Sequence, residues 1–186
     1  MFNIQQLENK IKGSAWWSDA ANVCDNHYSP HEGIMLAHHL QAVHSNIESI
    51  FTQPASDFYS KMFDLLPLLQ LDKQIVMDEL KIAALLHDIG KPKEDKTLVI
   101  PHPLTGKPAH KRHGLVGLMA AMEIIGEDLA HLPEMRNRIY RTVELHAMSY
   151  GLFREFIATG DIPQNERWNY IDNKIHNITG GGLLYL

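Results

Sequence analysis

The sequence predicts an all-α fold: one domain built as a helical bundle, with a small β-hairpin or flap inserted around residues 97–110. Three observations predict it. Apolar residues recur at helical spacing along most of the chain. Glycine and proline separate these segments where helices are expected to end. The short run Thr97-Leu98-Val99-Ile100 is rich in β-branched residues and is followed by proline and glycine, which is typical of a strand and turn.

Length and composition limit the classes of protein to which this chain can belong. The 186 residues match one domain, and 45% apolar residues suffice for a sizeable core. The net charge of −5 makes extended nucleic acid an unlikely partner. The single cysteine, Cys24, leaves no internal disulfide, and no apolar run approaches the ~20 residues of a membrane span. The N-terminus lacks a leader pattern. We therefore expect a cytoplasmic protein with no membrane partner, and the oligomeric state stays open.

The spacing of apolar residues and the positions of glycine and proline predict the individual helices and loops. Residues 1–29 are expected to hold an N-terminal helix and a loop. The helix covers 1–12 and is ended by Gly13, and the loop begins at Asn22 and reaches Pro30. Trp16 and Trp17 between them are expected to anchor packing. The core of the domain is expected over 30–175, with helices over 34–51, 57–70, 73–88, 113–125, 133–148, 152–158 and 163–176. The tail 177–186 combines glycines with an apolar end, and its role stays open.

Helix ends carry recognisable residues. Asp72 is a candidate N-cap for the 73–88 helix, and Pro133 stands in the first turn of the 133–148 helix. The 73–88 helix is apolar around much of its circumference, which predicts a central, largely buried helix. Small residues in the 113–125 helix would let another helix approach closely. They are Gly114, Gly117, Ala120 and Ala121.

His87 and Asp88 stand side by side where the central helix ends. Adjacent helical residues point about 100° apart, so the two side chains can converge only where the helix stops. Gly90 and Pro92 are residues that end helices. Imidazole beside carboxylate is a typical metal-binding combination, although an inert hydrogen-bonded pair in the core would give the same dipeptide. The twelve histidines of the chain, several of them close to predicted helix ends, favour the metal site.

The candidate metal ligands lie on different predicted helices, and facing helices of a bundle often build such a centre. The candidates are His38, His87, Asp88, His113, His146 and a late carboxylate, Asp172 or Asp161. Mixed histidine and carboxylate ligands suit divalent Mn, Fe, Ni, Co, Zn or Mg, so the identity of the metal stays open. His113 and His146 could be additional ligands, or groups that contact phosphate.

The run Leu85-Leu86-His87-Asp88-Ile89-Gly90-Lys91 resembles the signature of the HD-domain metal-dependent phosphohydrolase superfamily. The stretch His31-Glu32-Gly33 with His38 is similar to the segment that carries the first ligand of that family. His113-Gly114 with Gly117 and Met119 resembles the corresponding helix of the HD domains linked to tRNA nucleotidyltransferases. The resemblance covers residues 30–175 and implies an HD-type helical bundle.

The resemblance also implies roles. His38, His87, Asp88 and Asp172 would bind one divalent metal, with His39 as the alternative to His38 and Asp161 as the alternative to Asp172. Asp88 would orient or deprotonate water, while Lys91 and His113 would neutralise charge on phosphate oxygens. Expected substrate contacts are His31, Lys91, Lys111 and Arg112.

The implied activity is hydrolysis of a small-molecule phosphoester by metal-activated water. The expected substrate is a nucleotide or nucleotide-like phosphomonoester or phosphodiester. The alternative is a non-catalytic metal- or nucleotide-binding module that senses or scaffolds. A narrower option is action on nucleic-acid ends, against which the absence of a basic surface argues. No Walker-type or dinucleotide-binding glycine pattern is present in the sequence.

Overall fold

The computed structural model describes residues 3–29, 33–53, 57–101 and 108–176, and these are mostly helical, which confirms the predicted fold class. The helices in chain order are α1 (Ile4–Lys12), α2 (Ala15–Ala21), α3 (Leu36–Thr52), α4 (Asp57–Leu65), α5 (Lys73–Leu86), α6 (His113–Ile125), α7 (Pro133–Leu145), α8 (Met148–Thr159) and α9 (Asn165–Ile175). Short 3-10 helices are η1 (Pro67–Leu69), η2 (Lys91–Lys93) and η3 (Lys96–Leu98). The tip of the predicted insert (102–107) and the tail (177–186) lie outside the described residues.

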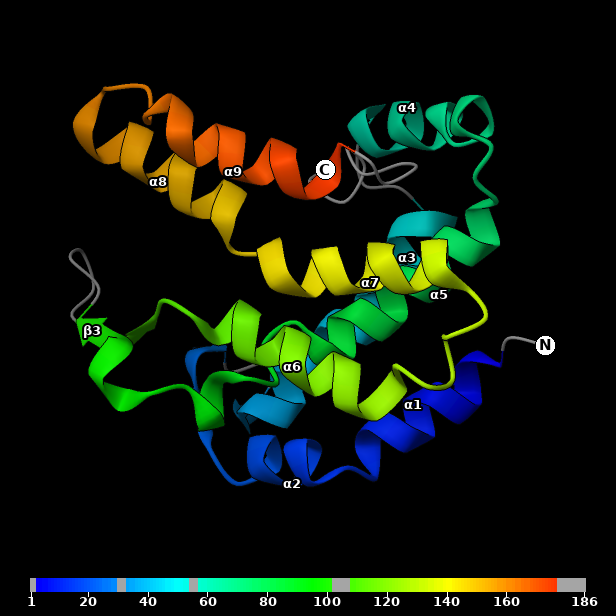
Figure 1. The fold of residues 1–186 in the computed structure, drawn as a ribbon, viewed down its shortest axis with the longest axis horizontal. Coiled ribbons are helices and arrows are strands. Elements are labelled where there is room, and N and C mark those ends of the chain that lie inside the picture. The colour runs from blue at the N-terminus through cyan, green and yellow to red at the C-terminus, as the bar shows by residue number, and fades with distance from the viewer. Residues whose placement is uncertain (1–2, 30–32, 54–56, 102–107, 177–186) are drawn as a thin grey trace.

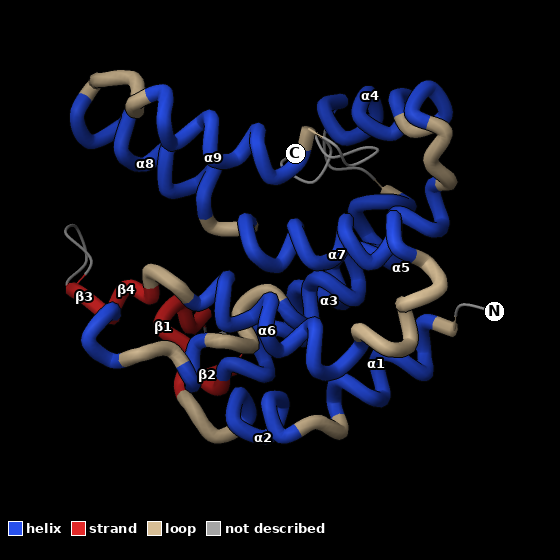
Figure 2. The backbone as a smooth tube through the Cα atoms, viewed as in Figure 1, coloured by secondary structure: helices blue, strands red, loops and turns tan. Residues whose placement is uncertain are grey.

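Two antiparallel strand pairs lie among the described residues (Figure 2). β3 (Val99–Pro101) pairs with β4 (Pro108–His110), which confirms the hairpin insert. β1 (Cys24–Ser29) pairs with β2 (Gly33–Met35), although a loop was predicted over 22–30. That prediction was wrong because the stretch is polar and shows no period-two apolar alternation, so its strand character comes from pairing and not from an apolar face.

The central helix is α5, as predicted. Ile82, Leu85 and Leu86 are fully buried, and α5 packs against α3 and α7 as well as α1 and α6. The carboxylate of Asp72 accepts a hydrogen bond from the backbone N–H of Ile75, so the predicted N-cap is present. In Figure 1, α1 and α2 lie below the bundle, and α8 and α9 run side by side above α7.

The N-terminal helices belong to the same core. Leu7 and Ile11 of α1 and Trp16 of α2 are buried in the main hydrophobic cluster, and Trp17 packs against it, which confirms the two tryptophans as packing anchors. Gly13 caps α1, as predicted. This packing brings the chain that follows α2 beside the end of α5, where the candidate site lies.

Glycines allow α6 to approach its neighbours closely. A Cβ on Gly90 would stand 2.5 Å from both the backbone N of Gly117 and the carbonyl oxygen of His113. A Cβ on Gly114 would collide with the carbonyl of Glu144 in α7. The predicted close approach at Gly114 and Gly117 is therefore confirmed. It sets the start of α6 directly against the end of α5 and the end of α7.

Substitution of Gly90 tests this constraint. We expect Gly90→Ala to lower the free energy of unfolding by about 1–3 kcal/mol, because the added methyl meets backbone that cannot rotate away. Gly151 of α8 is the matched control, since a Cβ there meets nothing within 4 Å. Gly151→Ala should be neutral or stabilising by up to about 1 kcal/mol. Urea unfolding of both variants measures the difference, and equal stabilities would contradict the packing argument.

Candidate metal centre

Four helix ends or turns supply the candidate site. α5 ends at Leu86, so His87 caps it and Asp88 lies in the following turn, where both side chains reach one place as predicted. His39 comes from the second turn of α3. His113 is the first residue of α6, and His146 caps α7. The site therefore depends on the packing of α3, α5, α6 and α7.

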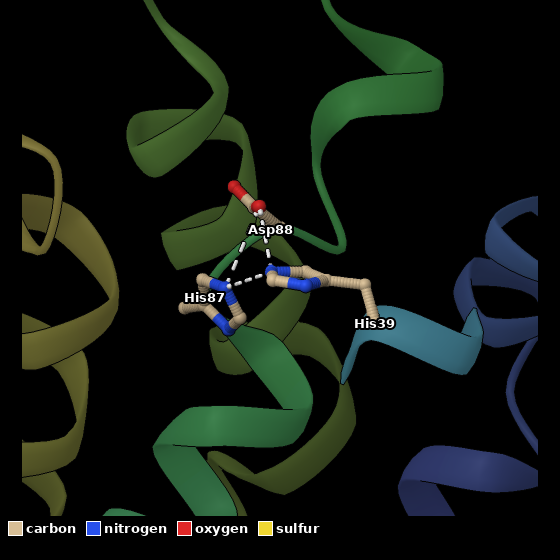
Figure 3. A group of neighbouring side chains, drawn as sticks. All are labelled: His39, His87 and Asp88. Atoms are coloured by element: carbon tan, nitrogen blue, oxygen red, sulfur yellow. Dashed lines mark hydrogen bonds and ion pairs between the residues drawn. The ribbon is translucent and has the colours of Figure 1, made fainter. Parts of the chain in front are cut away.

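His39, His87 and Asp88 form the first cluster, shown in Figure 3. The Nε2 atoms of His39 and His87 are 3.3 Å apart. Oδ2 of Asp88 lies 3.7 Å from Nε2 of His39 and 3.4 Å from Nε2 of His87. The three side chains thus direct one ligand atom each toward a common point.

Asp88, His113 and His146 form the second cluster. The Nε2 atoms of His113 and His146 are 3.0 Å apart, and they lie 3.1 Å and 3.4 Å from Oδ1 of Asp88. Each oxygen of the Asp88 carboxylate therefore faces a different pair of histidines. One carboxylate joins the two clusters.

The other ring nitrogens determine which atom can bind an ion. Nδ1 of His87, His113 and His146 lies 2.8, 2.7 and 2.8 Å from the carbonyl oxygens of Ala84, His110 and Val143. A carbonyl only accepts, so each Nδ1 carries the proton and donates it. In the neutral rings Nε2 then carries a lone pair, which faces Asp88. This arrangement is the one that orients metal-binding histidines.

The clusters fit a divalent metal. The Nε2 atoms of neutral His113 and His146 face each other without a proton between them, and Oδ1 of Asp88 has no hydrogen-bond partner among the described residues. Ligand atoms roughly 2.1 Å from an ion stand about 3.0–3.5 Å apart. The separations within the two clusters fall in this range, except the slightly longer 3.7 Å between Nε2 of His39 and Oδ2 of Asp88. These buried histidine and carboxylate groups can hold a metal ion, whose identity the donor set leaves open.

The pKa shifts of Asp88 and His146 favour a bound metal ion, whereas that of His87 favours a competing proton. Burial raises the pKa of Asp88, but the charge of His87 and the neighbouring rings outweigh it and hold this pKa well below its ordinary value. Burial lowers the pKa of His146, which favours the neutral ring that a metal needs. Burial also lowers the pKa of His87, but Asp88 outweighs it and raises this pKa overall. A proton and a metal ion therefore compete for Nε2 of His87.

Glu94 holds the second cluster in place. Its side chain is fully buried, Oε2 lies 2.7 Å from Nδ1 of His110, and Oε1 accepts from the backbone N–H of Arg112. The carbonyl of His110 is the acceptor for Nδ1 of His113. Glu94 therefore connects the hairpin β3–β4 to the orientation of His113.

Sequence reasoning missed Asp25. Its carboxylate is fully buried beside the site: Oδ1 lies 3.3 Å from Nζ of Lys91, and Oδ2 lies 4.0 Å from Nδ1 of His39. Nζ of Lys91 is also 2.6 Å from Oδ2 of Asp88. The available signal was weak, since Asp25 is merely the one acidic residue of the stretch 22–30, which was predicted to be a loop.

The structure favours His39 over His38, the reverse of the preference drawn from the sequence. His38 is exposed, whereas His39 faces the site. The reason is helix register. Leu36 and Leu40 are buried in the core, and His39 lies at the edge of this buried face of α3, while His38 is turned about 100° further away and is exposed.

The late carboxylates do not join the described clusters. Asp172 is exposed on α9, and Asp161 is exposed between α8 and α9. α9 instead turns Tyr170 and Lys174 toward α7, where their polar atoms lie 3.3 Å and 2.9 Å from Oε1 of Glu144. In the described clusters the groups beside Asp88 are histidines, and neither of the two predicted late carboxylates is among them.

The predicted substrate contacts are placed differently. Lys91 is buried between two carboxylates, so it is not a solvated loop lysine. Lys111 and Arg112 are exposed next to the start of α6. His31 lies outside the described residues. Among these four, only Lys91 has described contacts with the metal clusters.

No protein-family model matches the chain, and no curated protein or solved structure matches it either. Within the residues that the structure describes, no helix has the length and apolar character needed to cross a membrane. The assignment of the site therefore depends on its own geometry and on the motif around His87 and Asp88.

Two neighbouring substitutions test the register of α3. We expect His39→Ala to lower the affinity for Mn or Zn by about 10-fold or more, because it removes one ligand of the first cluster. His38→Ala is the matched control and should leave the affinity unchanged, since His38 is exposed. Isothermal titration calorimetry of the metal-free variants measures both. A larger loss in His38→Ala than in His39→Ala would contradict this register.

Proposed function

We propose that this chain is a metal-dependent phosphohydrolase of the HD type, which hydrolyses a small phosphoester such as a nucleotide-like monoester or diester. One observation carries the proposal: each oxygen of the buried Asp88 carboxylate faces a separate pair of histidine Nε2 atoms. The resemblance of the motif from Leu85 to Lys91 to the HD signature supports the same reaction class.

The metal would be held by Asp88 together with His39 and His87, by His113 and His146 on the other oxygen, or at both positions. A bound divalent ion supplies Lewis acidity for a phosphoryl oxygen and lowers the pKa of bound water. The ionised Asp88 carboxylate would orient that water and accept its hydrogen bond. The carbonyls of Ala84, His110 and Val143 keep the rings from rotating, so the ligand geometry is prepared in advance.

Charge supports an anionic substrate. The buried carboxylates Asp25 and Asp88 exceed the ammonium of Lys91 by one negative charge. A divalent ion reverses that excess, so the loaded site would attract a phosphate group. Lys91 would then stabilise charge that develops on phosphoryl oxygens, and His113 would do so only where the ion lies beside His39 and His87 and leaves its Nε2 free. Lys111 and Arg112, exposed at the start of α6, are the candidates for contacting the rest of the substrate.

A non-catalytic metal-binding sensor is the second candidate. The observation that favours it is the exposure of Asp172 and Asp161, the two late carboxylates that the HD resemblance implies as ligands. In that case the clusters would bind metal, or metal with a phosphate ligand, without turnover. Action on nucleic-acid ends is a third option, and a steep salt dependence of binding would support it.

A hydrolysis screen tests the leading proposal. Wild-type protein with added Mn is assayed against aryl phosphates, aryl phosphodiesters, nucleoside monophosphates and cyclic nucleotides. We expect metal-dependent release of phosphate or alcohol, and loss by about 10³-fold or more in Asp88→Asn, because the shared carboxylate is removed.

Asp172→Asn is the matched control, since it removes an exposed carboxylate and should keep full activity. Stoichiometric metal with no turnover across the whole screen would favour the sensor over the hydrolase. Loss of activity in Asp172→Asn would instead restore that residue as a ligand and contradict the cluster assignment.

A further inference from the structure

Asp25 lies beside the candidate metal centre, near His39 of the first cluster and near Lys91, whose ammonium also contacts Asp88. Its side chain is fully buried although it comes from β1, a segment outside the HD-like motif. Oδ1 lies 3.3 Å from Nζ of Lys91, and the same ammonium lies 2.6 Å from Oδ2 of Asp88. The ammonium of Lys91 is thus shared between the Asp88 carboxylate, which belongs to both clusters, and the Asp25 carboxylate, which belongs to neither.

The second oxygen of Asp25 lies near His39 of the first cluster. Oδ2 lies 4.0 Å from Nδ1 of His39 and has no hydrogen-bond partner among the described residues. Burying a carboxylate oxygen without a hydrogen-bond donor costs free energy, so nearby positive charge must offset that cost. The groups that can supply the charge are Lys91, His39 and an ion bound beside His39.

We propose that Asp25 is a positioning residue of the metal centre: it shares the ammonium of Lys91 with Asp88 and so keeps the Asp88 carboxylate available to a cation. The inference rests on the proposed metal-dependent function. It assigns Asp25 no contact with substrate, because its role passes through Lys91 and His39.

Lys91 and a bound metal ion compete for the carboxylate of Asp88. Lys91 pairs with two carboxylates, those of Asp25 and Asp88. Without Asp25, its buried ammonium would pair with Asp88 alone among the described residues. It would then neutralise the oxygen that His39 and His87 also face. A metal ion would have to displace that ammonium, and the centre would also have lost a negative charge that attracts the ion. Both effects weaken metal binding.

The test uses Asp25→Asn, Lys91→Gln and the double variant D25N/K91Q, with Mn binding to metal-free protein measured by isothermal titration calorimetry. We expect D25N to bind Mn about 10- to 100-fold more weakly, as for other residues that orient metal ligands. K91Q should bind at least as tightly as wild type. The double variant should return to within about threefold of wild type, because the competing charge is gone.

Asp19→Asn is the matched control. Asp19 of α2 pairs with Lys93 of η2 at 3.2 Å, so it also joins the N-terminal segment to the turn after Asp88, but both partners are partly exposed and outside the clusters. D19N should leave Mn affinity unchanged. Thermal melting of each metal-free variant separates lost binding from lost fold.

The outcomes separate this inference from the proposed function. Wild-type protein that binds neither Mn nor Zn would overturn both. Wild-type binding with unchanged affinity in D25N would overturn the inference alone. A double variant as weak as D25N would show that Asp25 acts through structure, and that result also overturns it. If D25N does not fold, K91Q decides, because weaker Mn binding in K91Q would contradict competition for Asp88.

Discussion

The buried carboxylate of Asp88 is the constraint on which the rest of the structure depends. An ionised carboxylate in a protein interior must be matched by positive charge or by hydrogen-bond donors. Around Asp88 the ammonium of Lys91 supplies one such partner, but three of the four histidine rings that face the carboxylate already use their Nδ1 protons on backbone carbonyls. Oδ1 of Asp88 therefore stays without a hydrogen-bond donor among the described residues. A further cation would satisfy it, and this is why the geometry supports a metal centre and not an inert core pair.

The fold supplies this environment through helix ends. His87, His113 and His146 each stand at the end or start of a helix, where the backbone leaves its helical course and a carbonyl three residues earlier can accept from Nδ1. Gly90 and Gly114 allow α5, α6 and α7 to meet closely enough for these ends to converge. The close packing of these helices therefore sets the site geometry, because a longer distance between the helices would separate the candidate ligands.

Segments outside the central motif complete the centre. β1 brings Asp25 to Lys91, and Glu94 fixes the base of the hairpin β3–β4 against the start of α6. Both carboxylates are fully buried, and each contacts a group beside the clusters: Asp25 contacts Lys91, and Glu94 contacts His110 and the backbone N–H of Arg112. Charge and orientation around the proposed metal thus come from the N-terminal segment and the insert as well as from the four-helix core.

The sequence by itself determined the helical class, the central position of α5, the hairpin insert and the convergence of His87 and Asp88, because apolar periodicity, caps and glycines act locally. It also identified His113 and His146 as candidates. Only the tertiary structure decided between His38 and His39, left Asp172 and Asp161 exposed, and brought Asp25 beside Lys91. These choices depend on helix register and on contacts between segments more than 60 residues apart in the chain, such as Asp25 and Lys91. A single sequence carries no direct record of such contacts, since they arise when the helices pack.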